Sequence, residues 1–321
     1  MKIFIEIPSW LGDAVMTTPA IENLVKTYPD AKLTIYGSYV STRLFVHHPH
    51  VENIFIDESK KEGFRYLNLY RDAKKVGKFI KESKAFDVAL SFRKNFTTQY
   101  LLFFLGVKKR YIYKRYTKKE IHQVIRYNDF INKSFNLQTI PDKLKIYGYE
   151  DTKISDKKLL GLNPGATYGS AKRWYPEEFA KVAIEMSKEY DIVIFGGPNE
   201  DEIAGDIEKL LIKAGVKNYK NLAAKTTVEE LISGISKLDL FVTNDSGPMH
   251  LAAAFGIPTV TVFGPTKYTE TNQWMNEKGV IVTKDLDCAP CMKRVCPLGH
   301  HNCMKLIKAE DVIKKIEDIT L

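Results

Sequence analysis

The stretch LDLFVTNDSGPMHLAAAFGIPTVTVFG, residues 238–264, decides the fold of this chain. An apolar, β-branched run at 240–243 leads into a polar turn, a helical run of small residues at 248–255 and a second β-branched run at 259–263. Gly256 is placed to end the helix in a left-handed conformation. A strand, a helix and a strand in this order are typical of neighbouring strands in a parallel sheet.

The same alternation continues outward from this stretch to both ends of the chain. We expect further strands at residues 2–8, 32–36, 53–57, 87–92, 110–113, 159–163 and 191–195. We expect further helices at residues 67–83, 95–105, 118–135, 176–190, 200–214 and 228–238. Strands that alternate with helices along a whole chain indicate an α/β fold with parallel sheets.

Two of these helices begin with recognisable signals. Pro176 suits the first position of a helix, where its missing N–H costs nothing. Thr227 and Glu230 have the spacing of a capping box, in which each side chain accepts a hydrogen bond from the other residue's backbone N–H. These signals support the predicted boundaries.

The length of the chain indicates two domains. Its 321 residues exceed the roughly 100–200 residues that one hydrophobic core usually serves. Residues 137–158 lose helical periodicity and contain Pro141 and Gly148, so they form the candidate linker. We predict two Rossmann-like domains, residues 1–150 and 151–321, with a ligand cleft between their strand ends.

The composition places the chain among folded proteins of the cytoplasm. Hydrophobic residues make up 44% and charged residues 27%, which excludes a disordered chain or a disulfide scaffold. The longest strongly apolar run, 100–107, is much shorter than the roughly 20 residues of a membrane-spanning helix. Residues 1–8 carry Glu6 inside their apolar run, so we expect no secretory leader.

The net charge of +9 belongs to the first half of the chain. Residues 1–150 hold 26 basic and 15 acidic residues, whereas residues 151–321 hold 22 and 24; within 60–126 the numbers are 19 and 5. Such a stretch forms either solvated helix faces or a surface that meets phosphate, on nucleic acid or on a lipid headgroup.

The first motif that could carry chemistry is PSWLGD, residues 8–13, directly after the first strand. A strand, a glycine turn and a helix start expose backbone N–H groups to an anion. Asp13 could cap the helix, or it could act as a general base toward an acceptor hydroxyl.

The second motif is NPGATYGSAKRWYP, residues 163–176, between a strand and a helix. Its glycines and small hydroxyl residues allow close approach of the backbone to a ligand, and Lys172 and Arg173 supply cations. The motif therefore favours a diphosphate site in which Lys172 neutralises a departing nucleotide. An ordinary surface loop is the alternative.

The third motif is TNDSGPMH, residues 243–250, again between a strand and a helix. Asp245, Ser246 and Gly247 offer an acceptor, a hydroxyl and free N–H groups, which suit sugar hydroxyls and phosphate. The alternative is a simple helix cap followed by a packed His250. Neither GxGxxG nor GxxxxGK[ST] occurs, so a dinucleotide fingerprint and a P-loop are unsupported.

All the cysteines lie near the C-terminus. Their spacing is CxxC, four residues, Cys, six residues, Cys, and His300 and His301 lie among them. These residue types suit structural zinc, although the spacing fits no standard finger. Reduced and packed thiols, a zinc site and a disulfide stay open as alternatives for Cys288, Cys291, Cys296 and Cys303.

In order, LGD at 11–13, KRWYPE at 172–177, GGPNE at 196–200 and NDSGPMHLAAA at 244–254 resemble the ADP-heptose:lipopolysaccharide heptosyltransferases, glycosyltransferase family 9. The cysteine segment is most similar to the heptosyltransferase II branch. The resemblance implies a GT-B fold whose N-terminal Rossmann-like domain binds the acceptor and whose C-terminal domain binds the nucleotide-sugar.

The resemblance also implies roles for individual residues. Asp13 matches the general base, Lys172 the group that holds the leaving ADP, and Glu200 a carboxylate that holds the ribose hydroxyls. The remaining donor-binding residues are Thr167 at the diphosphate, Thr226 near adenine, and Asp245, Ser246, Gly247 and His250 at the heptose and phosphate. The implied reaction is a single inverting displacement that requires no metal or other cofactor.

The implied donor is ADP-L-glycero-D-manno-heptose, and the implied acceptor is heptosyl-Kdo-lipid A at the cytoplasmic face of the inner membrane. We expect peripheral attachment to that membrane and no nucleic-acid partner. An alternative is another heptosyltransferase of the family, adding the first or a later heptose. A remote alternative is a nucleic-acid-binding module, in which tyrosines among the basic residues stack on bases: Tyr111, Tyr113, Tyr116 and Tyr127.

Overall fold

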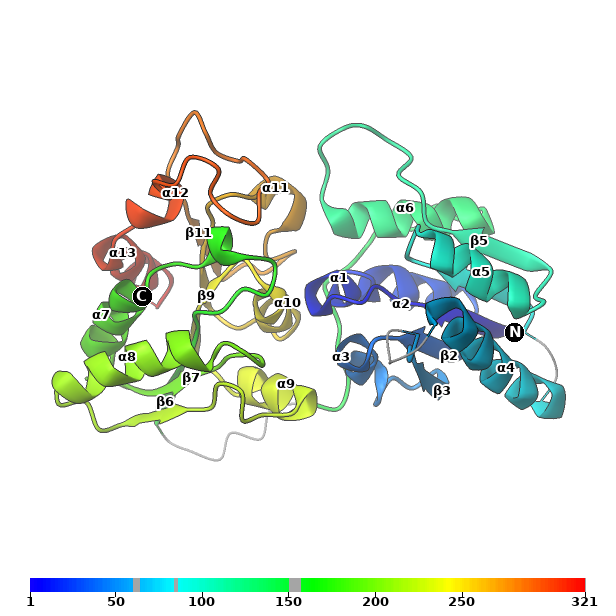
Figure 1. The fold of residues 1–321 in the computed structure, drawn as a ribbon, viewed down its shortest axis with the longest axis horizontal. Helices are drawn as coiled ribbons and strands as arrows, with labels where there is room; N and C mark the ends of the chain where they lie inside the picture. Colours follow the sequence, from blue (N-terminus) through cyan, green and yellow to red (C-terminus); the bar gives the residue numbers. More distant parts are fainter. Residues whose placement is uncertain (60–63, 84–85, 150–156, 321) are drawn as a thin grey trace. The chain divides into compact units, whose positions relative to one another are not determined.

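The computed structural model describes residues 1–59, 64–83, 86–149 and 157–320. It contains two compact units, Met1–Gly148 and Tyr149–Leu321. Each unit has a parallel sheet with helices packed on it, so the predicted α/β class is confirmed (Figure 1). The separate roles expected for residues 1–150 and 151–321 remain predictions.

Within its described residues, the first unit has a five-stranded parallel sheet in the order β3-β2-β1-β4-β5. The strands are β1 (Lys2–Glu6), β2 (Lys32–Gly37), β3 (Val51–Ile56), β4 (Val88–Ser91) and β5 (Lys109–Ile112). The helices are α1 (Leu11–Val15), α2 (Thr18–Thr27), α3 (Tyr39–Thr42), η1 (Arg43–Phe45), α4 (Arg65–Ser83), α5 (Phe96–Phe104) and α6 (Gln123–Phe135). The central strand β1 is buried from Ile3 onward, as expected for a strand covered on both faces.

The second unit, over the residues described, has a six-stranded parallel sheet in the order β11-β10-β9-β6-β7-β8. The strands are β6 (Lys158–Asn163), β7 (Tyr190–Ile194), β8 (Tyr219–Asn221), β9 (Leu240–Asn244), β10 (Thr259–Val262) and β11 (Gly279–Val282). The helices are η2 (Ser170–Lys172), α7 (Pro176–Met186), α8 (Asp201–Lys213), α9 (Val228–Ser236), α10 (Gly247–Ala254), α11 (Tyr268–Thr271), α12 (Asn302–Lys305) and α13 (Ala309–Thr320). The stretch that opened the sequence analysis thus forms β9, α10 and β10.

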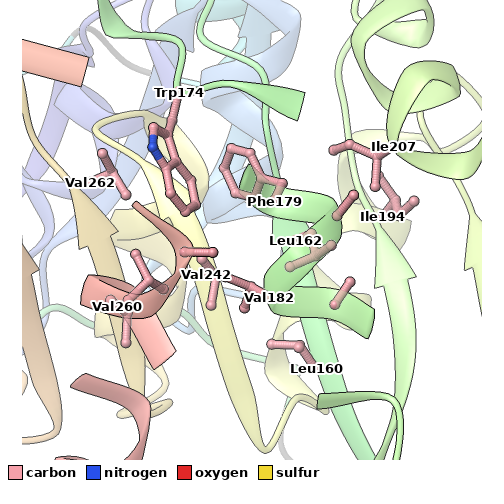
Figure 2. Packing of buried hydrophobic residues seen from close by; sticks show 14 of the residues in the cluster. Leu160, Leu162, Trp174, Phe179, Val182, Ile194, Ile207, Val242, Val260 and Val262 are labelled. Carbon is pink, nitrogen blue, oxygen red and sulfur yellow. The ribbon is translucent and has the colours of Figure 1, made fainter. Parts of the chain in front are cut away.

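Trp174 anchors the core of the second unit. Its ring is fully buried and packs edge-to-face on Phe179, with ring centroids 4.9 Å apart (Figure 2). Its indole N–H donates to the carbonyl oxygen of Ile307 at 3.0 Å, and its backbone N–H donates to Asn244 Oδ1 at 3.0 Å. A buried tryptophan needs a partner for its N–H, and both donors are satisfied here. The end of the 164–173 loop is therefore fixed to the core.

The local signals in the sequence are confirmed. Pro176 occupies the first turn of α7. Both hydrogen bonds of the capping box between Thr227 and Glu230 are present at the start of α9. Gly256 has a φ of +65°, the left-handed conformation expected after α10.

Two predicted helices are too long by about a turn or more. The helix predicted at 118–135 begins at Gln123, because His122 is extended and its Nδ1 accepts a hydrogen bond from the backbone N–H of Val124. The helix predicted at 176–190 ends at Met186, because Tyr190 pairs with Lys158 as the first residue of β7. Strand pairing outweighs local helical periodicity at that end.

Candidate active site

The ends of three neighbouring strands build the site in the second unit. Leu162 of β6 pairs with Ile194 of β7, and Asn163 of β6 pairs with Thr243 of β9. The strands are parallel, so the loops that follow them leave the sheet at the same edge. The second and third sequence motifs and the GGPNE turn therefore lie side by side.

Two asparagines at the ends of β6 and β9 tie these loops together. The Asn163 side-chain amide donates to Ser246 Oγ at 3.1 Å and to the carbonyl oxygen of Gly165 at 3.3 Å. The Asn244 side-chain amide donates to the carbonyl oxygen of Pro164 at 2.7 Å. Both asparagines are buried, and these bonds fix the spacing of the two loops before any ligand binds.

Lys172 and Asp245 form an ion pair at the centre of this edge. Lys172 Nζ lies 2.5 Å from Asp245 Oδ2, and the two side chains are 13% and 4% exposed. The Thr266 hydroxyl donates to the same carboxylate oxygen at 2.5 Å. The Lys172 ammonium also lies 4.8 Å from the centre of the Tyr168 ring. A cation held in this way has a fixed position and is little screened by water.

Glu200 lies at the start of α8 but does not cap it through its side chain. Its Oε2 accepts a hydrogen bond from the backbone N–H of Gly197 at 2.8 Å. Its Oε1 is buried and has no hydrogen-bond partner among the described residues. A Cβ at Gly165 would lie 2.0 Å from Oε2, so only glycine leaves room for this carboxylate. The unpaired oxygen is suited to accept a hydrogen bond from a ligand hydroxyl.

The other predicted donor residues lie around the same edge. Ser246 is the N-cap residue of α10, but its side chain makes no capping bond; its hydroxyl accepts from Asn163 instead. Gly247 is the first residue of α10, and His250 is buried one turn further along. Thr167 is exposed in the second motif. Thr226 follows β8 in a loop that is joined to the GGPNE turn by a 3.0 Å bond from Ala224 N–H to the carbonyl oxygen of Gly196.

Asp13 belongs to the first unit, where it lies in the first turn of α1 and is half-buried. Burial raises the pKa of the Tyr127 phenol well above its ordinary value, and the charge of Asp13 raises it further. The Asp13 carboxylate and Tyr127 of α6 thus interact electrostatically within the first unit. On the same helix, the Gln123 side chain donates to the Tyr113 hydroxyl at 3.2 Å.

A buried ionic cluster fixes the strand ends of the first sheet. The Arg93 guanidinium lies 3.0 Å from Glu6 Oε1 and 3.1 Å from Asp57 Oδ2. Burial raises the pKa of Glu6. For Asp57, burial acts in the same direction, but hydrogen bonds from Ser59 and Arg93 outweigh it and hold the pKa below its ordinary value. This cluster joins the ends of β1, β3 and β4 and was not predicted from the sequence.

The cysteines are brought together by the fold. All four are free thiols that line one cavity of about 20 Å³, together with Ala171, Pro265 and His301. Burial raises the pKa of Cys303 to about 11, and the other three cysteines add to the rise. Among the described residues, no group of three or more His, Cys, Asp or Glu side chains is arranged to hold a metal ion.

The cysteine segment also holds the loop that carries Lys172. The Ala171 N–H donates to the carbonyl oxygen of Arg294 at 3.0 Å, and the Tyr168 hydroxyl donates to the carbonyl oxygen of Met292 at 3.1 Å. His301 Nε2 lies 2.9 Å from the Ala171 carbonyl oxygen, and His301 Nδ1 lies 3.2 Å from the Tyr175 hydroxyl. Both ring nitrogens are engaged within the protein, which disfavours His301 as a ligand in the zinc alternative.

Sequence reasoning missed several residues of this site. Thr266 lies in the loop after β10, as Asp245 lies in the loop after β9, so its place after a predicted strand was a usable signal. The contacts of Tyr168 with Arg294 had no such signal, because more than a hundred residues separate them in the sequence.

The comparisons with known proteins agree with this geometry. A family model described as glycosyltransferase family 9 (heptosyltransferase) matches residues 76–302. The chain is 43% identical over 328 residues to lipooligosaccharide heptosyltransferase 2 of Campylobacter jejuni, covering 99% of this chain and 98% of that protein. It is 26% identical over 350 residues to lipopolysaccharide heptosyltransferase 2 of Escherichia coli K12, covering 100% and 99%.

The fold is also similar to that of known heptosyltransferases. The solved structure of E. coli ADP-heptose lipopolysaccharide heptosyltransferase II matches with a TM-score of 0.82 at 22% identity, covering 99% of this chain and 98% of that one. The predicted GT-B fold is thereby confirmed. Since the family model matches more than half of the chain, the chain belongs to glycosyltransferase family 9, the heptosyltransferases.

Proposed function

We propose that this enzyme transfers L-glycero-D-manno-heptose from ADP-heptose to the first heptose of the lipopolysaccharide inner core. One observation carries the proposal: at the carboxyl edge of one sheet, adjacent loops hold an ion-paired lysine and a buried carboxylate oxygen that has no partner in the described parts of the chain. This edge is where α/β folds bind nucleotides. The similarity to heptosyltransferases 2 over the whole chain supports the choice of donor and acceptor.

The donor contacts follow from the chemistry of each group. Glu200 Oε1 accepts a hydrogen bond from a ribose hydroxyl, which satisfies an otherwise orphaned buried oxygen. Lys172 and the N–H groups at the start of α10 receive the diphosphate. Thr167 supplies a hydroxyl to the diphosphate, and the segment with Thr226 lies along adenine. Asp245, Ser246, Gly247 and His250 complete the heptose and phosphate site.

The transfer is a single inverting displacement. Asp13 removes the proton from the acceptor hydroxyl as that oxygen attacks the anomeric carbon. The bond from that carbon to the ADP oxygen breaks, and Lys172 neutralises the charge that develops on the departing diphosphate. Because fixed protein groups supply the positive charge, the reaction as proposed needs no added cofactor.

We propose that Lys172 has two anionic partners during the catalytic cycle, Asp245 and the donor diphosphate. Without donor its charge is compensated by Asp245 at 2.5 Å. When the diphosphate arrives, Lys172 is shared between two anions, and Asp245 can accept hydrogen bonds from sugar hydroxyls. Thr266 keeps the carboxylate in place while Lys172 neutralises the leaving group.

The acceptor we propose is heptosyl-Kdo-lipid A, bound by the first unit at the cytoplasmic face of the inner membrane. Its phosphates suit the excess of basic residues in 60–126. No helix in the described parts of the chain is long and apolar enough to span a membrane, so the attachment we propose is peripheral. Nucleic acid is not a proposed partner. Tyr127 is buried and offers no face for base stacking, and Tyr113 packs against Tyr127 and Phe130.

A turnover assay with defined acceptors tests the proposal. Purified enzyme and ADP-heptose are incubated with Kdo-lipid A carrying no heptose, one heptose or two heptoses. The products are identified by mass spectrometry. We expect transfer only to the acceptor with one heptose. Transfer to the heptose-free or the two-heptose acceptor instead would assign the enzyme to another step of the same family.

A further inference from the structure

The outer side of α4 and α5 carries a row of exposed aromatic side chains. Phe64 is 70% exposed, Phe96 65% and Phe103 64%. Tyr66 and Phe104, at 37% and 40%, continue the row. Folded proteins expose single apolar residues freely, but a contiguous set marks a surface that meets another apolar phase.

The exposed rings are contiguous rather than scattered. Tyr66 lies 5.7 Å from Phe64 and 6.1 Å from Phe96, measured between ring centroids. Tyr100 lies between the two helices' rings, 5.6 Å from Tyr66 and 4.6 Å from Phe104. Phe103 lies 5.3 Å from Phe104. The contacts form one ladder that crosses from α4 to α5, which are neighbours in the first unit (Figure 1).

The core does not explain this row. Leu101, Leu102 and Leu105 already fill the side of α5 that faces the sheet, where they pack in a cluster with Phe4. A helix that is apolar on all sides is normally buried on all sides. The outer rings of α5 are exposed instead, so their apolar character serves something outside the unit.

Basic residues are frequent on α4 and at the start of α5, the two helices that carry the aromatic row. From residue 64 to 78 the only acidic residue is Asp72, which is buried and accepts a hydrogen bond from the Tyr36 hydroxyl. Lys94 precedes α5 and is exposed. Among the α4 side chains that the structure describes, the exposed cations are Arg65, Arg71, Lys74, Lys75 and Lys78, of which Lys75 pairs with Glu58 at 2.9 Å. The surface is thus both aromatic and cationic, and we name it the α4–α5 face.

These two properties together select one partner. Aromatic rings settle at the headgroup level of a bilayer, and lysine and arginine attract anionic lipids. A second copy of the chain fits poorly, because a two-fold interface would place the same cations opposite each other.

We propose that the α4–α5 face is the surface with which the enzyme lies on an anionic lipid bilayer. The inference deepens the proposed function, since it names the part of the chain that brings the enzyme to a membrane-bound acceptor. Binding to vesicles is measured without donor or acceptor, so its outcome is separate from that of heptosyl transfer.

Vesicle flotation of the full chain tests the proposal. The vesicles contain phosphatidylglycerol and phosphatidylethanolamine, or phosphatidylcholine alone. The double variant Phe96→Ser/Phe103→Ser removes two rings, and Arg71→Gln/Lys78→Gln removes two charges. The matched control is Ile140→Ser/Ile212→Ser, whose side chains are 84% and 60% exposed and lie outside the face. Thermal unfolding checks that all variants fold.

We expect the wild type to float with anionic vesicles and not with phosphatidylcholine. The phenylalanine variant should bind at least about tenfold more weakly, and the charge variant about fivefold more weakly for each charge removed. The isoleucine control should bind like the wild type. Transfer to a deacylated, water-soluble acceptor should be unchanged in the phenylalanine variant.

Three results would overturn the proposal. One is equal flotation of the phenylalanine variant and the isoleucine control. Another is equal binding of the wild type to anionic and neutral vesicles. The third is a dimer that becomes a monomer on Phe96→Ser/Phe103→Ser while no form of the protein floats, which would assign the face to a second copy.

Discussion

Lys172 Nζ lies 2.5 Å from Asp245 Oδ2, and both side chains are largely withdrawn from solvent. The two residues come from different loops, one after β6 and one after β9, so the pair exists only because those strands are neighbours. Each charge compensates the other in a place where an unpaired charge would be costly.

Removal of Lys172 should therefore cost stability as well as activity. We expect Lys172→Met to lower the free energy of unfolding by about 3 kcal/mol, because Asp245 keeps a buried, uncompensated charge. The double variant Lys172→Met/Asp245→Asn should recover most of this loss while turnover stays low. Urea denaturation measures the free energy of unfolding of both variants, and the transfer assay measures their turnover. A stable single variant would show that the pair is not held as tightly as its geometry indicates.

Asp13 tests the assignment of the general base. We expect Asp13→Ala to lower turnover by a factor of about 10² to 10⁴, the range of general acid-base catalysis. Calorimetric titration with ADP-heptose should give nearly unchanged affinity, because Asp13 belongs to the first unit. Turnover close to that of the wild type would exclude Asp13 as the base.

Gly165 tests the proposed ribose contact through the backbone. An added Cβ would lie 2.0 Å from Glu200 Oε2, so Gly165→Ala should displace the carboxylate and raise KM for the donor more than KM for the acceptor. Gly205→Ala is the matched control, since Gly205 lies in α8 with free space around its Cβ position. That variant should keep its activity and gain up to about 1 kcal/mol of stability. Equal kinetics of the two variants would argue against the contact.

The four cysteines should differ in reactivity. The backbone N–H of His301 is the main cause that lowers the pKa of Cys296, whereas burial raises the pKa of Cys303 to about 11. A lower pKa gives more thiolate at a given pH, so iodoacetamide should modify Cys296 first and Cys303 last as the pH rises from 7 to 9. Peptide mass mapping follows each site. If all four thiols were instead protected from iodoacetamide until a chelator was added, a bound metal would be indicated, which is the zinc alternative.

Some of this fold and site could be predicted from local sequence. The strand, helix and strand at 238–264, the capping box of Thr227 and Glu230, and the left-handed Gly256 depend on residues a few positions apart. The end of one predicted helix was wrong because a distant contact decided it, the pairing of Tyr190 with Lys158. The start of another was wrong because of a local bond between Val124 and His122. Lys172 and Asp245 were each predicted, but their pairing was not.

The amino-acid sequence by itself determined the α/β class, the alternation of strands with helices, and the family, because periodicity, turn chemistry and motif spacing are properties of short stretches; the strands Tyr219–Asn221 and Gly279–Val282 and the helices Thr18–Thr27 and Ala309–Thr320 were not predicted. Only the tertiary structure decided that Thr266 holds Asp245, that the cysteine segment holds the Lys172 loop, and that the aromatic rings of α4 and α5 form one exposed row. These relationships depend on which strands pair and which helix faces the sheet covers, and the free energy of burying apolar surface sets both for the chain as a whole.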